Sequence, residues 1–257
     1  MRIVGSLTGT ILIFSFIFIG NNLVFAQTNN SLFLQANNVY NEGKFEKARE
    51  MYEKLIFEKN VVSAEVFYNL ANCYFKMNDL GKAILNYKRA FMVHPRDKLI
   101  NDNLSFARGL VKYKVEDTRN WYIRKGEEIL SYITEDELHI CSLLLFSMIV
   151  IFWILVLFTK SKIVKRLTTL LYILFFISIG AVVFKHFPLS TAHEAVIIAD
   201  EAEVRYGPTS TDKIAFRLIA GIEVILKSEK DDWVKIGLHS GKEGWINKTS
   251  LEAVKWR

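Results

Sequence analysis

Two kinds of hydrophobic pattern divide the 257-residue chain, continuous apolar runs and periodic stretches. One apolar run lies near the start, and two others span residues 139–158 and 167–184 without any Asp, Glu, Lys or Arg. Between residues 27 and 110 apolar positions recur at helical spacing, whereas from residue 193 they alternate with polar ones. The pattern predicts a helical region, two helices of membrane-spanning length, and a set of short strands.

The most informative helical stretch is residues 64–95, in which two helical patterns are interrupted at Asn78 and Asp79. Small side chains occur where two helices would touch, and bulky ones where they would fill the space between neighbouring helix pairs. This stretch resembles a tetratricopeptide repeat, whose period is about 34 residues. The small positions are Ala71, Ala83 and Ala90, the bulky ones are Phe67, Leu70, Tyr74 and Tyr87, and Pro95 ends the second helix.

A weaker copy of this pattern lies 35 residues earlier in the chain. Gln35 and Asn60 stand where the repeat would have Leu and Pro, so the first repeat is degenerate. After Pro95, the spacing of Ile100 and Leu104 predicts one more helix that caps the array. Two repeats with a cap are close to the minimum for such a stack.

The resemblance implies a peptide-binding groove lined by the first helix of each pair. Asn side chains can hydrogen-bond to a peptide backbone, and aromatic side chains supply contact area. The alternative is that some of these residues only pack against neighbouring elements. The predicted groove residues are Asn37, Tyr40, Asn41, Tyr68, Asn72, Phe75 and Lys76, with Phe33 beside them.

The first apolar run has the pattern of a secretory signal. Arg2 precedes the apolar centre, and the small residues Val24 and Ala26 suit cleavage after Ala26. The alternative is an uncleaved membrane anchor. Both interpretations predict that the residues that follow are exported.

The charge distribution predicts how the other two apolar runs are oriented. The chain has a net charge of +6, of which +4 lies in the eight residues 159–166 between the two runs. Short positively charged loops stay in the cytoplasm, so we expect residues 27–138 and 188–257 to be outside. A nucleic-acid-binding face is not indicated. Two buried helices of a soluble domain would need more surrounding chain than is present.

In the segment before the second run, residues 111–138, polar and apolar residues alternate irregularly. Trp121 and Tyr122 in this segment are typical of a helix that lies at the membrane surface. A helix that only connects the repeats to the membrane would explain the pattern equally well.

The carboxyl-terminal alternation resembles a bacterial SH3 domain. The matching motifs are Val204-Arg205-x-Gly207-Pro208, Gly221-x-x-Val224, Trp233-Val234-Lys235-Ile236 and Gly244-Trp245-Ile246. The resemblance implies a small β-barrel that binds peptides, often those of the cell wall. We expect Tyr206 and Trp233 to form an aromatic ledge for the ligand, and Trp245 to pack inside the barrel.

Nothing in the sequence indicates catalysis, a cofactor or a metal site. Cys73 and Cys141 lie in different predicted surroundings, and there is no CxxC motif or Cys/His cluster. Cys73 is expected to pack inside the repeats rather than to sense redox state. The histidines are scattered, with His239 in a predicted hairpin loop, and no set of nucleophile, base and orienting group is visible.

The predicted fold is multidomain: an all-α tetratricopeptide-repeat solenoid, a two-helix transmembrane hairpin and an all-β SH3-like barrel. This order of parts resembles the BatE-type proteins of the aerotolerance operon. The resemblance implies a non-enzymatic scaffold in the bacterial inner membrane that works with von Willebrand A-domain membrane proteins and a MoxR-type AAA ATPase. The alternatives are a peptidoglycan-binding tether or sensor, and an enzyme of unknown type. The expected segments are a signal peptide at 1–26, repeats at 27–110, a juxtamembrane helix at 111–138, membrane helices at 139–158 and 167–185, a cytoplasmic loop at 159–166, and the SH3-like domain at 193–257.

Overall fold

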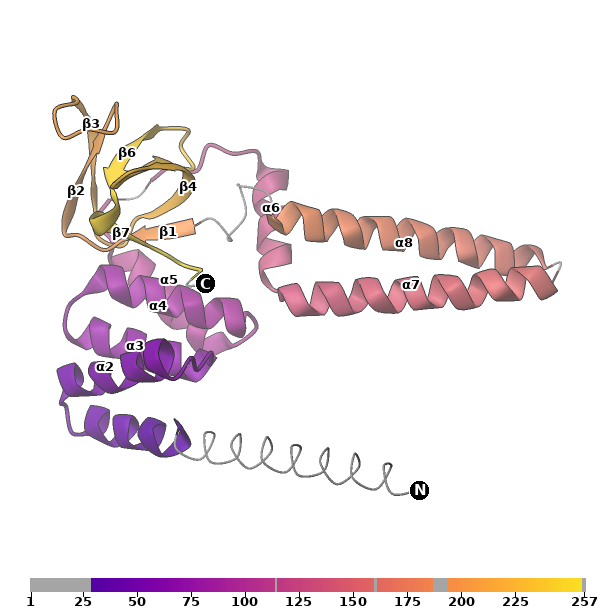
Figure 1. Ribbon diagram of the computed structural model, residues 1–257, viewed down its shortest axis with the longest axis horizontal. Coiled ribbons are helices and arrows are strands. Elements are labelled where there is room, and N and C mark those ends of the chain that lie inside the picture. Colours follow the sequence, from indigo (N-terminus) through magenta and orange to yellow (C-terminus); the bar gives the residue numbers. More distant parts are fainter. Residues whose placement is uncertain (1–28, 114, 160, 187–193, 256–257) are drawn as a thin grey trace, which may run out of the picture.

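The computed structural model describes residues 29–255, apart from residues 114, 160 and 187–193. The predicted signal peptide, residues 1–26, lies outside the described residues. Figure 1 shows a stack of helices, a β module beside the end of that stack, and a helical hairpin. We call residues 29–111 the repeat module and residues 194–255 the β module.

The repeat module consists of antiparallel helices connected by tight turns. Residues 29–41 form the first helix. The helices that follow are α2 (Phe45–Glu53), continued by the π-helical turn η1 (Lys54–Glu58), α3 (Ala64–Lys76), α4 (Leu80–Val93) and α5 (Lys98–Leu110). The helix break predicted at Asn78 and Asp79 is confirmed. Asn78 has a φ of 63°, and the Asp79 carboxylate accepts a hydrogen bond from the Lys82 backbone N–H at 3.1 Å, which caps α4.

Packing between these helices depends on the alanines that the sequence singles out. Ala71, Ala83 and Ala90 are completely buried, as are the bulky Phe67 and Leu70 beside them. Small side chains at these positions let α3 and α4 approach closely, and a larger side chain would push them apart. The predicted α-helical stack is therefore confirmed.

The chain leaves the repeats through a short helix and then forms a long hairpin. These helices are α6 (Trp121–Ser131), α7 (Glu135–Phe158) and α8 (Lys162–His186). Thr134 and Glu137 make a capping box that begins α7. Figure 1 shows α7 and α8 side by side, projecting away from both modules.

Both hairpin helices are long and apolar enough to cross a membrane. These segments are Asp136–Phe158 and Lys162–Phe184. In an 18-residue apolar stretch of each, only 11% and 6% of the residues are buried. Hydroxyls of Ser142 and Ser178 hydrogen-bond to each other between the two helices. Because α8 already begins at Lys162, much of the predicted loop 159–166 is the first turn of that helix.

The β module is one antiparallel sheet of seven strands, with the order β3-β2-β6-β5-β4-β1-β7. Its edge strands β3 and β7 do not pair, so the sheet is open, which is consistent with the SH3-like module that the sequence predicts. The strands are β1 (Glu194–Ile197), β2 (Glu201–Arg205), β3 (Ile214–Ile219), β4 (Glu223–Lys230), β5 (Trp233–Gly237), β6 (Glu243–Asn247) and β7 (Leu251–Ala253).

The two modules are packed against each other and share one hydrophobic core. Strand β1 lies on α4. The backbones approach so closely that a Cβ atom added at Gly81 would lie 2.7 Å from the Ile197 carbonyl oxygen. Helix α5 packs on α4, and the β module contacts α4 through β1 and α5 through the Arg108–Glu223 ion pair. The sequence patterns give two separate modules and do not predict this contact.

Candidate functional site

The predicted groove residues lie on the first helix of each repeat, and several of them bond within the array. The Asn37 side-chain oxygen accepts from the Tyr52 hydroxyl at 2.5 Å, and the Asn72 oxygen accepts from the Tyr87 hydroxyl at 2.5 Å. The two pairs are 35 residues apart, so the same hydrogen bond recurs in both repeats. These Asn oxygens are engaged, and the amide nitrogens are the groups that remain for a ligand.

The other groove residues differ in how much surface they offer. Tyr40 packs edge-on against Phe45, with ring centroids 5.2 Å apart. Tyr68 accepts a hydrogen bond from Asn103 at 3.1 Å. Asn41 and Lys76 are exposed, and no described side chain pairs with either of them.

Helix α5 extends this surface in a way that the sequence patterns did not predict. The ring of Phe75 lies 6.0 Å from that of Phe106, which is itself exposed. Asn103 lies one turn before Phe106 on the same helix. Helix α5 begins 34 residues after α3, so Phe106 corresponds to Asn72, which the sequence analysis singled out, whereas Asn103 corresponds to Asn69, which it did not.

The two aromatic residues that are predicted to form a ledge lie on different segments of the β module, Tyr206 after β2 and Trp233 at the start of β5. No ring contact joins Tyr206 and Trp233 among the described residues, and Tyr206 follows the end of β2 with 74% of its surface exposed. Trp245 alternates with the buried Ile246 on β6, so it lies on the opposite face of the sheet from the core. The expectation that Trp245 packs inside is therefore wrong. The register places Trp233 and Trp245 on neighbouring strands and the same outer face.

A buried ion-pair network joins the two modules. The Lys88 ammonium on α4 contacts the carboxylates of Glu194 and Glu223 in the β module, and only 5% of its side chain is exposed. Arg108 on α5 binds Glu223 with two hydrogen bonds, of 2.5 and 3.0 Å. Burial alone would raise the pKa of Glu223, but Lys88 and Arg108 outweigh it and hold the pKa well below its ordinary value.

A second contact holds the end of the β module. The Arg89 guanidinium donates to the backbone carbonyls of Val254 at 3.1 Å and Ala253 at 2.8 Å, and to the Glu252 carboxylate at 2.7 Å. Arg89 is itself buried. The sequence patterns did not single out Lys88 or Arg89, because charged residues on a predicted amphipathic helix are usually solvated.

The linker before α6 forms a third polar cluster. Arg119 binds Asp117 at 2.6 Å and Glu127 on α6 at 2.5 Å. Its hydrogen bonds lower the pKa of Asp117 to about 2. Burial raises the pKa of Glu127 and lowers that of His239, whose backbone carbonyl accepts from the Thr118 hydroxyl at 3.2 Å.

The half-buried ring of His239 should make the protein less stable in mild acid. Because burial lowers its pKa, the folded protein keeps this ring neutral at pH values where the unfolded chain, with an ordinary pKa of about 6.5, takes up a proton. Stability should therefore fall as the pH drops below about 6.5. Arg119, Lys88, Asp117 and Glu194 all act on this ring.

The measurement is thermal unfolding of the wild type and of His239→Gln at pH 7.5 and 5.5. We expect the wild type to lose more stability between the two pH values. The raised pKa of Glu127 acts in the opposite direction in both proteins, so the comparison isolates the histidine. Equal losses in the two proteins would contradict the assignment.

No catalytic or metal-binding arrangement is visible in the described part of the chain. Groups of three or more His, Cys, Asp or Glu side chains that could hold a metal ion are absent among the described residues. Burial raises the pKa of the Cys73 thiol to about 12, so this side chain is not a thiolate at neutral pH.

Comparison with protein families identifies the two modules. The tetratricopeptide repeat family matches residues 64–97, and the bacterial SH3 domain family matches residues 199–252. No curated protein matches the chain. Both matched families are non-catalytic binding domains. The protein therefore combines a protein-binding repeat array and an SH3-type module with two helices that could anchor it in a membrane.

Proposed function

We propose that the protein is a non-enzymatic, membrane-anchored scaffold that presents two exported binding surfaces. The observation that carries this proposal is the way the modules dock. The β module contacts α4 and the end of α5, and this arrangement leaves Asn41 and Lys76 of the groove exposed. Tyr206 is exposed at the same time. Each surface is therefore available to a separate ligand while the modules stay joined.

The proposed orientation has both modules outside the cytoplasm. Both attach at the same end of the α7–α8 hairpin, as Figure 1 shows. Lys162, Lys165 and Arg166 begin α8 at the other end, where a positive cluster favours the cytoplasmic side. A signal peptide cleaved after Ala26 would export the repeat module in this orientation.

The proposed partners follow from the resemblance to BatE-type proteins. They are von Willebrand A-domain membrane proteins and a MoxR-type AAA ATPase, in a complex linked to aerotolerance and envelope stress. Two ligands held on one rigid unit would have a raised effective concentration near each other. The groove residues Asn37, Tyr40, Asn41, Tyr68, Asn72, Phe75 and Lys76 are proposed to bind one of these partners.

Charge reversal in the groove tests the scaffold proposal. In cells that lack the native protein, we expect the wild type to restore the size of the membrane complex and survival under oxidative stress. Lys76→Glu should fail to do so, because a like-charge or unpaired contact at an interface weakens binding by about tenfold or more. Lys54→Glu is the matched control, since Lys54 is an exposed lysine on η1 outside the groove. If deletion leaves complex size and survival unchanged, the proposal fails.

A peptidoglycan-binding tether is the second candidate, and the exposed aromatic residues of the SH3-type module favour it. Tyr206 offers most of its ring, and Trp233 is half-buried on the outer face. The test is sedimentation of the full-length protein, in mild detergent, with purified peptidoglycan. A tether should sediment, and Tyr206→Ala should sediment less. Absence of wild-type sedimentation would remove this candidate.

A further inference from the structure

Helix α6 has an apolar side that the rest of the described protein leaves largely uncovered. Four large side chains recur along this side at helical spacing, each with between 42% and 72% of its surface exposed: Trp121, Tyr122, Ile129 and Tyr132. Beside them, a Cβ atom placed at Gly126 would have nothing of the described protein within 4 Å. A contiguous exposed apolar surface of this kind marks a site of contact with a protein or a membrane.

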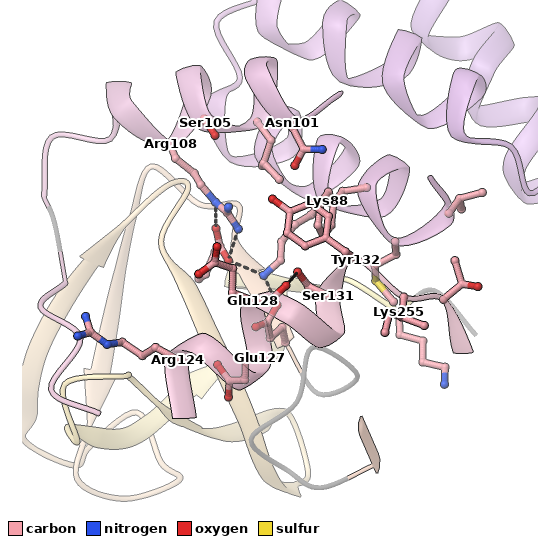
Figure 2. A pocket seen from close by; sticks show the side chains of 18 of the residues that line it. Lys88, Asn101, Ser105, Arg108, Arg124, Glu127, Glu128, Ser131, Tyr132 and Lys255 are labelled. Atoms are coloured by element: carbon pink, nitrogen blue, oxygen red, sulfur yellow. Dashed lines mark hydrogen bonds and ion pairs between the residues drawn. The ribbon is translucent and has the colours of Figure 1, made fainter. Parts of the chain in front are cut away.

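The opposite side of α6 is polar and faces the two modules. It lines a cavity of about 960 Å³ that lies between α4, α5, α6 and the β module, which we call the junction cavity. Figure 2 shows side chains that line this cavity, including Arg124 and Glu127 of α6. Trp121, Tyr122 and Ile129 do not line it. Helix α6 is therefore amphipathic, with its apolar side turned away from the cavity.

The connection to α7 keeps α6 close to the proposed membrane surface. Helix α6 ends at Ser131 and α7 begins at Glu135, four residue steps later. At about 3.5 Å for each step, the two helix ends lie within about 14 Å of each other. The segment of α7 that could cross a membrane begins at Asp136, so α6 ends beside the point where the chain would enter the lipid.

The direction of α6 brings its whole length to that surface. Figure 1 shows α6 running across the end of the α7–α8 hairpin, instead of continuing in the direction of α7. Its 11 residues make a helix that is about 16 Å long. The headgroup layer of a bilayer is only about 5–8 Å thick on each side. A helix along the direction of α7 would extend beyond this layer, whereas a helix across the hairpin keeps all its turns at a similar depth.

The composition of α6 fits a neutral lipid surface. Its two basic and two acidic residues cancel, and the Lys125 ammonium pairs with the Glu128 carboxylate at 2.9 Å. Helices that depend on anionic lipids carry an excess of Lys and Arg on their polar side, which α6 lacks. Trp and Tyr side chains favour the boundary between headgroups and acyl chains, because their rings are apolar and carry one polar group. Zwitterionic lipid is therefore sufficient for this contact.

We propose that α6 lies in the membrane surface on the side of the two modules, with Trp121, Tyr122 and Ile129 inserted between the lipid headgroups. This inference rests on the proposed anchoring by α7 and α8, and it adds a third membrane contact to that hairpin. The polar side of α6 then faces the junction cavity and the modules above it.

Anchored in this way, α6 determines how the repeat module stands on the membrane. The ring of Tyr132 lies 6.2 Å from that of Phe91 on α4, measured between centroids. Arg96, between α4 and α5, pairs with Glu137 in the first turn of α7. The repeat module is thus held at two points, which limits its rotation above the hairpin.

Fluorescence quenching by labelled lipid tests the depth of α6. The full-length protein is placed in vesicles of phosphatidylcholine, part of which carries a nitroxide on its acyl chain near the headgroup. An environment-sensitive fluorophore is attached through Gly126→Cys, where there is room for it, in a Cys141→Ala background that removes the exposed native cysteine. Cys73 is buried and does not react. We expect a blue-shifted emission and strong quenching at position 126.

Two further label positions decide the outcome. The same fluorophore attached through Arg124→Cys lies on the cavity side of the same helix and should be quenched at least about threefold less. The native Cys141 on α7, labelled in the otherwise unchanged protein, shows whether the hairpin is in the bilayer. Quenching at 141 together with equal quenching at 124 and 126 would overturn the placement of α6 and leave the anchoring intact. Absence of quenching at 141 would overturn the anchoring, and this inference with it.

A pair of substitutions assigns the contact to the apolar side chains. Tyr122→Ser with Ile129→Ser should reduce the quenching at position 126 by about half or more, because both side chains are exposed and available to lipid. Phe57→Ser with Leu99→Ser is the matched control, since these residues are similarly exposed on η1 and α5, and it should leave the quenching unchanged. Unchanged quenching with both pairs would mean that the hairpin alone positions α6, and would contradict the proposal.

Discussion

Replacing Lys88 by Ala should destabilise the protein by about 3–5 kcal/mol, the largest effect that we expect from one substitution. The ammonium is buried between Glu194 and Glu223, so its removal leaves two carboxylates close together with only Arg108 to compensate. The loss should appear in urea unfolding of the full-length protein in mild detergent, followed by tryptophan fluorescence, because Trp233 and Trp245 report on the β module.

A charge-balanced variant shows that the effect comes from the unpaired carboxylate. The double substitution Lys88→Met with Glu194→Gln leaves Arg108 paired with Glu223 and should recover more than half of the lost stability. Lys98→Ala, at the exposed start of α5, is the control and should change stability by no more than about 0.5 kcal/mol. If Lys88→Ala unfolds like the wild type, the two modules do not dock through α4 in solution.

Replacing Gly81 by Ala should destabilise the protein by about 1–3 kcal/mol, although Ala favours a helix by nearly 1 kcal/mol over Gly. The added Cβ atom would lie 2.7 Å from the Ile197 carbonyl oxygen and 3.0 Å from the Ile198 Cα atom. Both atoms are backbone, so the contact is relieved only if β1 moves away from α4. The same unfolding measurement detects the change.

Gly109→Ala is the matched control for this prediction. Gly109 lies on α5 of the same module, and nothing lies within 4 Å of a Cβ atom placed there. We expect this variant to keep its stability or to gain up to about 1 kcal/mol. A loss of the same size in both variants would mean that helix propensity, and not contact with the β module, determines the result.

Local patterns predicted the individual elements of this protein well. Alanines at fixed spacing indicated the contact between α3 and α4, and Asn78 and Asp79 indicated the turn between them, because both signals act within one repeat. The two long uncharged runs indicated α7 and α8, since a helix of that length without charges suits a membrane. The sequence did not predict which residues lie on the outer face of the sheet. Trp245 and Ile246 are adjacent and both apolar, so only the strand register shows which one faces the core.

Contacts between segments that are distant in the sequence could not be predicted from local patterns. Lys88 meets Glu194 and Glu223, which lie 106 and 135 residues further along the chain. A lysine on a helix surface is usually solvated, so its burial depends on the module that covers it. The same holds for Gly81, which in a single sequence is only an unfavourable helix residue. The junction cavity exists only because of this docking, and no pattern within either module predicts it.

Site-specific photocross-linking in growing cells tests the central claim most directly. A photoreactive phenylalanine analogue is placed at position 76 in the groove or, as a control, at position 54 on η1, and cross-linked proteins are identified by mass spectrometry after purification through a carboxyl-terminal tag. A scaffold predicts a discrete adduct from position 76 that position 54 does not give, with von Willebrand A-domain membrane proteins or an AAA ATPase as its partner. Identical adducts from both positions, or no adduct from position 76, would contradict a binding role for the groove.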